Sequence, residues 1–273
     1  MKKFHHLSSD DIALRDGKVF LPNGFLDGKT RKNLGIPRVS DVYSIPDIEM
    51  KFSNGGHLYI TPDGQFVGIT SQLGMIHEFK FPIDQWKNSV GIKKASEISK
   101  AAIKRGLDFH SLTENYLKNK ILPQTEKLGL ELFNQAKPEL DKIDNIHCVE
   151  KALWSSEFKI AGRVDAIGSY GKLENCIIDF KSSRKPKEKS WILSYFLQAS
   201  AYSYMYQERT GIKIETLVII ISNEEGGVQT FIESRKNYER KLFECLKEYQ
   251  KLSKLNQNKI ILKSKNKIPG DTR

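Results

Sequence analysis

Two acidic residues and a lysine stand at the ends of two consecutive apolar runs of the chain. Asp165 ends the run that Gly162 opens, and Asp179 and Lys181 end the next run. Side chains two residues apart on a β-strand face the same side, so Asp179 and Lys181 point in one direction. Two carboxylates can anchor Mg²⁺ or Mn²⁺ beside a phosphate, and an adjacent ammonium can stabilise developing negative charge. These residues predict a metal-dependent phosphodiesterase site with Asp165, Asp179 and Lys181 as catalytic groups.

The Asp-x-Lys triplet is not specific by itself, because the same pair forms a salt bridge at many solvated strand ends. Its context favours a site, since an Ile-Ile run precedes Asp179 and a glycine-led strand precedes that run. The backbone carbonyl of Phe180, between Asp179 and Lys181, would add an oxygen ligand. The imidazole of His110 would complete the ligand set, although a lone histidine is more often packed or exposed.

Three further polar residues fit the same site, each with a structural alternative. Glu150 opens the strand before Gly162 and would reach metal-bound water, or it is simply exposed. Gln198 and Tyr202 are four residues apart, so they share one face of a predicted helix. They would brace the lysine or touch a DNA backbone, or they form the polar seam of an ordinary amphipathic helix.

Hydrophobic periodicity predicts an α/β core that runs from a long helix at 91–119 to an amphipathic helix at 236–255. The first helix would turn an apolar stripe inward, and a second helix would follow Pro123. The stripe consists of Ile98, Ala102, Leu107, Phe109, Leu112, Tyr116 and Leu117. Strands are expected at 146–154, 157–168, 173–181, 217–222 and 228–233, with a helix at 191–208.

Turn dipeptides predict hairpins before this core. Asp16-Gly17 and Asn23-Gly24 mark turns near the N-terminus, and Asn54-Gly55-Gly56 and Asp63-Gly64 mark turns between 51 and 82. The predicted organisation has three parts. Residues 1–90 form an extension of hairpins and short helices packed on the core, 91–257 form the core, and 258–273 form a basic tail, with the chain frayed from 251.

The composition favours a polyanionic partner and a reducing compartment. A formal net charge of +11 is typical of nucleic-acid binding, or equally of a surface solvated by lysine. Cys148, Cys176 and Cys245 form no Cys-x-x-Cys pair, so we expect free thiols and no iron–sulfur cluster. No stretch approaches the roughly 20 apolar residues of a membrane span, and the first residues lack an apolar signal region, so a cytoplasmic location is expected.

Taken in order, these residues resemble the RecB-like branch of the PD-(D/E)XK nuclease superfamily, and within it the mitochondrial genome maintenance exonuclease and related phage exonucleases. The matching motifs are Arg105-Gly106 with His110, Glu150, Gly162 with Asp165, Asp179 with Lys181, and Gln198 with Tyr202. They span about 105–202, and a weaker likeness begins at Ile36-Pro37. Each motif is loose alone, whereas five in the correct order are fairly specific.

The resemblance implies a restriction-endonuclease-like core, in which a central mixed sheet is flanked by helices, with N-terminal β-hairpin additions. It implies a Mg²⁺- or Mn²⁺-dependent DNA exonuclease of replication, recombination or repair that acts on single-stranded or end-bearing DNA. His110, Asp165, Asp179 and the Phe180 carbonyl would bind metal, Lys181 would be catalytic, and Glu150, Gln198 and Tyr202 would support the site. The expected DNA-binding residues are Arg105, Ser182, Arg184, Lys185 and Lys187. Trp191, Tyr195, Phe196 and Trp154 would stack on bases or belong to the core.

The chain departs from the family pattern in bulky residues between Arg105 and His110 and in a Pro-Arg-Val-Ser segment at 37–40. Residues 24–30 have three residues between glycines where a P-loop needs four, so we expect no ATP site. The enzyme would stand alone or work with a separate helicase or replication protein, in a bacterial or phage-infected cell rather than in the mitochondrial matrix. A structure-selective endonuclease and a non-catalytic DNA-binding module remain the alternatives.

Overall fold

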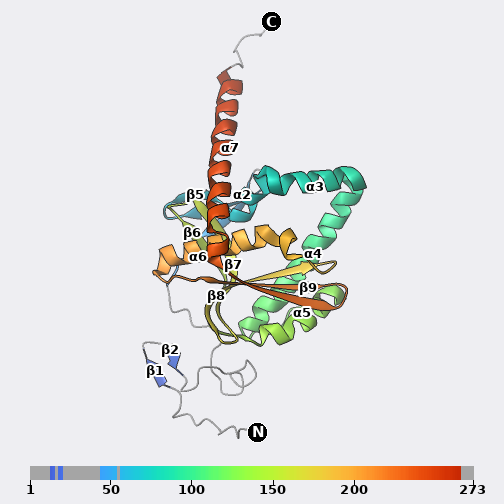
Figure 1. The fold of residues 1–273 in the computed structure, drawn as a ribbon, viewed down its shortest axis with the longest axis vertical. Coiled ribbons are helices and arrows are strands. Elements are labelled where there is room, and N and C mark those ends of the chain that lie inside the picture. The colour runs from blue at the N-terminus through green and yellow to red at the C-terminus, as the bar shows by residue number, and fades with distance from the viewer. Residues whose placement is uncertain (1–12, 16–17, 21–43, 54–55, 266–273) are drawn as a thin grey trace.

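The central element of the fold is a five-stranded mixed β-sheet with the strand order β10-β9-β8-β7-β6 (Figure 1). The computed structural model describes residues 13–15, 18–20, 44–53 and 56–265. Strands β6 (Ile143–Ser155), β7 (Ile160–Tyr170) and β8 (Leu173–Ser183) form an antiparallel meander. Strand β9 (Thr216–Asn223) runs parallel to β8, and β10 (Gly227–Ser234) closes the sheet antiparallel to β9. Strand β8, which carries Asp179 and Lys181, is therefore central.

Both faces of the sheet are covered, which explains the continuous apolar run in β9. Leu217, Ile219 and Ile221 point into one core, and Val218 and Ile220 point into the other. A strand buried on both faces has no polar side to present, so it reads as unbroken β-branched and aliphatic sequence. The expected strands at 217–222 and 228–233 are confirmed, as are the three strands before them.

Helix α6 (Leu193–Thr210) packs on one face of the sheet, and α5 (Lys127–Leu140) packs with the C-terminal half of α4 (Ile92–Leu117) on the other (Figure 1). A short 3-10 helix, η2 (Lys189–Ile192), precedes α6 and a second one, η3 (Arg235–Asn237), precedes α7 (Glu239–Lys265). Because α6 connects the parallel strands β8 and β9, it forms the crossover that such a pair requires. The predicted α/β core with a helix-covered sheet is confirmed.

A second, three-stranded sheet of β3 (Glu49–Ser53), β4 (Gly56–Thr61) and β5 (Gly64–Val67) precedes the core. Helix α2 (Ile69–Met75) follows it, and α3 (His77–Val90) then leads to α4. Asp63 ties the β4–β5 turn to the core, because its Oδ2 accepts hydrogen bonds from Trp154 Nε1 at 2.7 Å and Ser156 Oγ at 2.6 Å. The expected hairpins around 54–56 and 63–64 are confirmed.

The hairpin at Asp16-Gly17 is also confirmed, since β1 (Ala13–Arg15) pairs with β2 (Lys18–Phe20). The turn at Asn23-Gly24, the segment at 24–30 and the likeness from Ile36 lie outside the described residues. All three cysteines are buried. Within the described residues, no helix is both long enough and apolar enough to cross a lipid bilayer.

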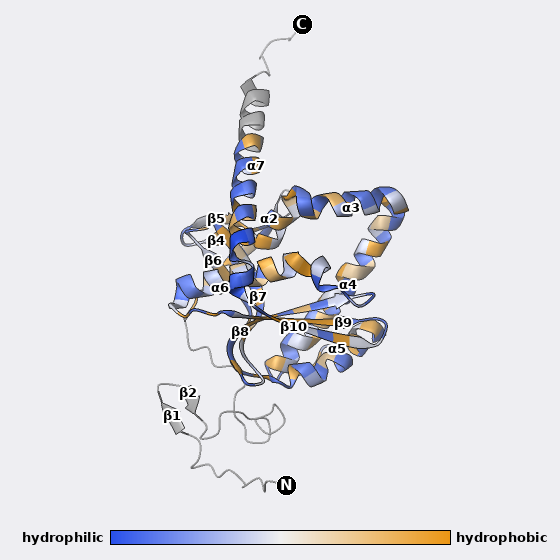
Figure 2. Cartoon of the chain, viewed as in Figure 1, coloured by the Kyte–Doolittle hydropathy of each residue, from blue (hydrophilic) through white to orange (hydrophobic). Residues whose placement is uncertain are grey.

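Two expectations about helices are wrong. The chain does not fray from 251, because α7 continues to Lys265, and the first residues in that region that break helices are Pro269 and Gly270. Leu107 does not point inward with the other apolar residues expected on that side of α4; it is exposed, because it lies on a different face from the buried Phe109 and Leu112. Figure 2 shows the resulting alternation of hydrophobic and hydrophilic residues along α4.

Candidate active site

The candidate site begins where β7 and β8 separate. The two strands are paired at Gly168–Cys176, Ile167–Ile177 and Ala166–Ile178, and the same register would next place Asp165 opposite Asp179. The pairing stops there, and Asp165 Oδ2 instead accepts a hydrogen bond from the backbone N–H of Phe180 at 2.7 Å. The carboxylate of Asp165 thus takes the place of a backbone acceptor and is held against the end of β8.

Asp179 and Lys181 form an ion pair at this point. Lys181 Nζ lies 2.5 Å from Asp179 Oδ2, as expected for residues two apart on one strand. The carboxyl of Asp179 is fully buried, and no other polar group of the described residues hydrogen-bonds it. Burial raises the pKa of Asp179 to about 6, although the charge of Lys181 opposes that rise. The ion pair with Lys181 therefore only partly offsets the free-energy cost of burying the charged Asp179 carboxylate.

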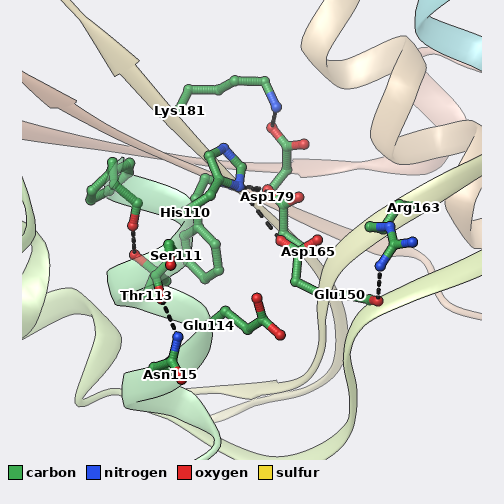
Figure 3. A network of polar contacts seen from close by, with 12 residues as sticks. His110, Ser111, Thr113, Glu114, Asn115, Glu150, Arg163, Asp165, Asp179 and Lys181 are labelled. Atoms are coloured by element: carbon green, nitrogen blue, oxygen red, sulfur yellow. Dashed lines mark hydrogen bonds and ion pairs between the residues drawn. The ribbon is translucent and has the colours of Figure 1, made fainter. Parts of the chain in front are cut away.

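His110 and Glu150 complete the cluster, from α4 and β6 (Figure 3). His110 Nδ1 lies 3.6 Å from Glu150 Oε1 and 3.6 Å from Asp165 Oδ1. One potential ligand atom from each of these three residues lies within 4.8 Å of the others. Strand pairing explains why Glu150 lies in this cluster, because the neighbouring pairs Val149–Ala166 and Lys151–Val164 place it across from Asp165.

The electrostatics of the cluster follow from burial and proximity. Burial raises the pKa of Asp165, and the charges of His110 and Lys181 only partly offset this. Burial would lower the pKa of His110, but the carboxylates of Asp165 and Glu150 outweigh it and raise that pKa overall. In Lys181 burial is likewise outweighed, here by Asp179 and Asp165, so its pKa is raised and the amine stays protonated. Burial is therefore the main reason that the pKa values of Asp165 and Asp179 are raised, and the neighbouring cations only partly offset it.

Gln198 and Tyr202 lie behind the carboxylates on α6. Gln198 Nε2 donates a hydrogen bond to Tyr202 OH at 2.8 Å, and both side chains are buried. Burial, together with the charges of Asp165 and Asp179, raises the pKa of Tyr202 well above its ordinary value, so the phenol stays neutral. Gly162 makes room for the ring, because a Cβ at that position would lie 2.6 Å from Tyr202 Cε1. This contact is the physical reason for a glycine three residues before Asp165.

The residues expected to bind DNA are partly engaged with the protein itself. The guanidinium of Arg105 forms an ion pair with Glu224 and donates to Ser182 Oγ at 3.4 Å. Arg184 is exposed. Lys185 Nζ lies 3.8 Å from Glu225 Oε1 at a well-exposed position. DNA contact by these residues stays a prediction.

The loop that carries these basic residues is held in place by β10. The backbone N–H of Lys187 donates to Gln229 Oε1 at 2.7 Å, and Gln229 Nε2 donates to the Lys187 carbonyl at 3.0 Å. Lys189 on η2 pairs with Glu233 on the same strand. The loop after β8 is thereby fixed relative to the sheet, with the side chain of Arg184 exposed to solvent.

Tyr195 was expected to stack on bases or to belong to the core, and the structure places it beside Lys181. Lys181 Nζ lies 5.2 Å from the centroid of its ring, within the range of a cation–π contact. The available signal was its spacing, because Tyr195 stands three residues before Gln198 and shares its helix face. Among the aromatic residues proposed to stack on bases, Phe196 and Trp154 are buried in the core and Trp191 is exposed.

The donor atoms fit a hard divalent cation. Asp165, Glu150 and His110 supply oxygen and nitrogen atoms at mutual distances that one ion can bridge. Among the residues that the structure describes, Lys181 is the only cation within hydrogen-bonding distance of the buried oxygens of Asp179. Oxygen-rich sites with one imidazole suit Mn²⁺ as well as Mg²⁺. No protein-family model and no curated protein matches the chain, so these distances and burials carry the functional argument.

Proposed function

We propose that the chain is a metal-dependent nuclease that hydrolyses phosphodiester bonds in DNA, acting as an exonuclease on single-stranded or end-bearing substrates. The observation that supports this most strongly is the meeting of Asp165, Asp179 and Lys181 at the separated ends of β7 and β8. A structural salt bridge needs two charges, whereas this cluster concentrates three carboxylates, an imidazole and an ammonium.

We also propose that the mixed sheet with its flanking helices is a restriction-endonuclease-like core of the RecB-like branch of the PD-(D/E)XK superfamily. The motif order supports this, since the histidine lies on the helix before the sheet, the acids lie on three successive strands, and Gln198 and Tyr202 lie on the crossover helix. The fold alone does not fix function, so the proposal depends on the site.

Mg²⁺ or Mn²⁺ is the cation that the donor set suits. His110, Glu150 and Asp165, whose potential ligand atoms lie within 4.8 Å of one another, would hold it, with Asp179 and the Phe180 carbonyl as further ligands. Such a cation supplies positive charge beside the phosphate and lowers the pKa of a bound water. The pKa values of Asp165 and Asp179 are raised mainly by burial, and they support this assignment because a bound cation would offset the cost of burying the two charged carboxylates.

The protein's own groups would stabilise charge, orient the ligands and exclude water. Lys181 is protonated and lies beside Asp179, where its ammonium can meet the negative charge that develops on the phosphate. The Phe180 N–H fixes the orientation of the Asp165 carboxylate. Tyr202 and Gln198 close the site from behind and exclude water from that side.

A digestion panel tests the proposal. End-labelled linear single strands, linear duplex and circular DNA are incubated with Mg²⁺, with Mn²⁺ or with chelator. We expect metal-dependent degradation of linear DNA that Asp179→Asn abolishes and that Glu174→Gln, at an exposed position on the same strand, leaves intact. Cleavage of circular DNA would identify an endonuclease. Absence of cleavage with both metals, or full activity of Asp179→Asn, would contradict the proposal.

A further inference from the structure

Helix α4 exposes an apolar stripe that leads to the candidate active site. Ile92, Ile103, Leu107 and His110 are separated by 11, 4 and 3 residues, and these steps return to the same face of an α-helix. The exposed fractions of the three apolar residues are 82%, 62% and 66%. We call Ile92, Ile103 and Leu107 the α4 stripe.

This stripe is not the face by which α4 packs. The buried residues of the helix, such as Ala95, Phe109 and Leu112, lie on other faces and contact the rest of the fold. An amphipathic helix normally directs polar residues to water and apolar residues to the core. Here a second apolar face points outward, and at its C-terminal end it reaches His110, which points to Asp165 and Glu150 (Figure 3).

Positive charge accompanies the stripe. Lys93, Lys94 and Lys100 are exposed on the same helix, and none of them forms an ion pair within the part of the chain that the structure describes. A surface hollow of about 520 Å³ lies at the start of the stripe, where α3 meets α4. It is lined by Val90, Gly91, Ile92, Lys93, Lys94 and Glu97. Apolar side chains therefore lie at the start and near the end of this face, Ser96 and Ser99 lie between them, and lysines lie beside it, along a path that ends at the site.

We propose that the α4 stripe binds the exposed bases of an unpaired nucleic-acid strand, with Lys93 and Lys100 beside its phosphates, and leads that strand to the site. This inference rests on the proposed nuclease function. Apolar side chains complement the flat faces of bases, and cations complement the backbone. A duplex keeps its base faces stacked within the helix, so only an unpaired strand can use the apolar half of the surface.

The length of the stripe sets a length for the bound strand. Ile92 and His110 are 18 positions apart in the numbering of the chain, which corresponds to about 27 Å at 1.5 Å per residue. This distance accommodates about eight stacked nucleotides at 3.4 Å each. Affinity for oligothymidine should therefore rise with length up to about eight nucleotides and then level off.

Binding without cleavage tests the inference directly. The full chain is titrated, in chelator, against a labelled single-stranded oligothymidine and a blunt duplex of equal length, and anisotropy is recorded. We expect Ile103→Ser with Leu107→Ser to weaken strand binding roughly tenfold and to leave duplex binding unchanged. The matched control is Ile121→Ser, which removes an apolar side chain at an exposed position off the stripe. Equal affinity of the double variant and the wild type for the strand, or an equal loss for strand and duplex, would overturn the inference.

A second variant does not depend on the apolar substitutions. Lys93→Ala with Lys100→Ala should reduce the slope of log affinity against log salt by about 0.7 for each lysine removed. An unchanged slope would overturn the role of these lysines beside the strand. If the wild type is a dimer that the serine variant makes monomeric, the stripe serves self-association and the inference fails.

Failure of this inference and failure of the nuclease function have different signatures. If the nuclease function alone is wrong, the stripe variants still lose strand binding while no metal supports cleavage. If the inference alone is wrong, Asp179→Asn abolishes cleavage while the stripe variants bind strands as the wild type does.

Discussion

The centroid of the Tyr195 ring lies 5.2 Å from Lys181 Nζ, and the same ammonium forms an ion pair with the carboxylate of Asp179. Lysine is a flexible side chain, and holding its ammonium over an aromatic face restricts where it can go. The position of the proposed catalytic amine is therefore set by two contacts of different kinds, one ionic and one aromatic.

Tyr195 should act as a positioning residue. Tyr195→Phe keeps the ring and should leave turnover within about twofold of the wild type, whereas Tyr195→Leu should lower kcat by about fivefold through loss of a contact worth about 1 kcal/mol. KM should stay the same in both variants. Steady-state kinetics on a labelled linear DNA measures this, and a change in KM rather than kcat in Tyr195→Leu would contradict it.

Removing the ammonium should separate metal binding from turnover. Lys181→Met should lower kcat by about 10²- to 10³-fold, as expected when a group that stabilises developing charge is lost. Metal binding should persist, because the carboxylates remain. Calorimetric titration with Mn²⁺ and single-turnover cleavage measure the two effects, with Lys127→Met as the exposed control. An unchanged cleavage rate would remove Lys181 from the mechanism.

Stability without metal should fall as pH rises through the pKa of Asp179. Its folded-state pKa of about 6 lies above the ordinary value of 3.8, so the folded chain binds the proton more tightly than the unfolded chain. The resulting stabilisation is complete below about pH 4 and is lost as pH rises through about 6, with a total of about 3 kcal/mol. Asp179→Asn should lack this component, which denaturant titrations in chelator between pH 4 and 8 can measure. Identical pH dependence of the two proteins would contradict the burial argument.

Divalent metal should reverse that loss. At pH 7.5, Mg²⁺ or Mn²⁺ at 100 times its dissociation constant should stabilise the wild type by about 2.7 kcal/mol, because it binds the folded chain. Asp179→Asn should respond far less, since one of the proposed ligands is gone. Thermal unfolding with and without metal gives the comparison, and Glu174→Gln serves as the matched control variant. Equal stabilisation of wild type and Asp179→Asn would place the metal elsewhere.

Gly162→Ala should disturb the site from behind. A methyl group there would lie 2.6 Å from Tyr202 Cε1 and 3.3 Å from Ile69 Cγ2, inside a packed core. Overpacking of this kind costs about 1–3 kcal/mol, and the displaced ring would loosen the wall behind Asp165. Chemical denaturation and cleavage assays measure both effects. Gly171→Ala is an unsuitable control because of its positive φ, whereas Gly74→Ala, with open space around its Cβ position, is a suitable one.

The sequence predicted the elements well where periodicity was strong. The unbroken run in β9 and the alternation in β10 identified two strands correctly, and the residue pair Asp179 and Lys181 on one strand was correctly expected to face one side. Local patterns sufficed in these cases because burial on one or both faces of a sheet leaves a direct imprint on residue type.

Contacts between distant segments were less predictable. The sequence did not show that Asp165 would accept a hydrogen bond from Phe180, because that bond depends on where the strand pairing stops. It did not place Tyr195 against Lys181 or pair Arg105 with Glu224, since both contacts join separate elements. Leu107 was wrongly assigned to the buried face of α4, because that face was taken to be wider than it is. The predicted end of α7 came too early, because polar residues replace apolar ones in its last turns.

The anchoring of Asp63 beside Trp154 has a consequence for where this protein can be divided. Tyr59, Ile69 and Leu73, from the segment that this anchor holds, are buried in the same hydrophobic core as Tyr202. A chain shortened to 91–257 would lose that packing and expose to solvent the side chains behind the candidate active site. The segment from β4 to α2 therefore belongs to the same folding unit as the core, and a shortened chain that still folds has to begin upstream of β4.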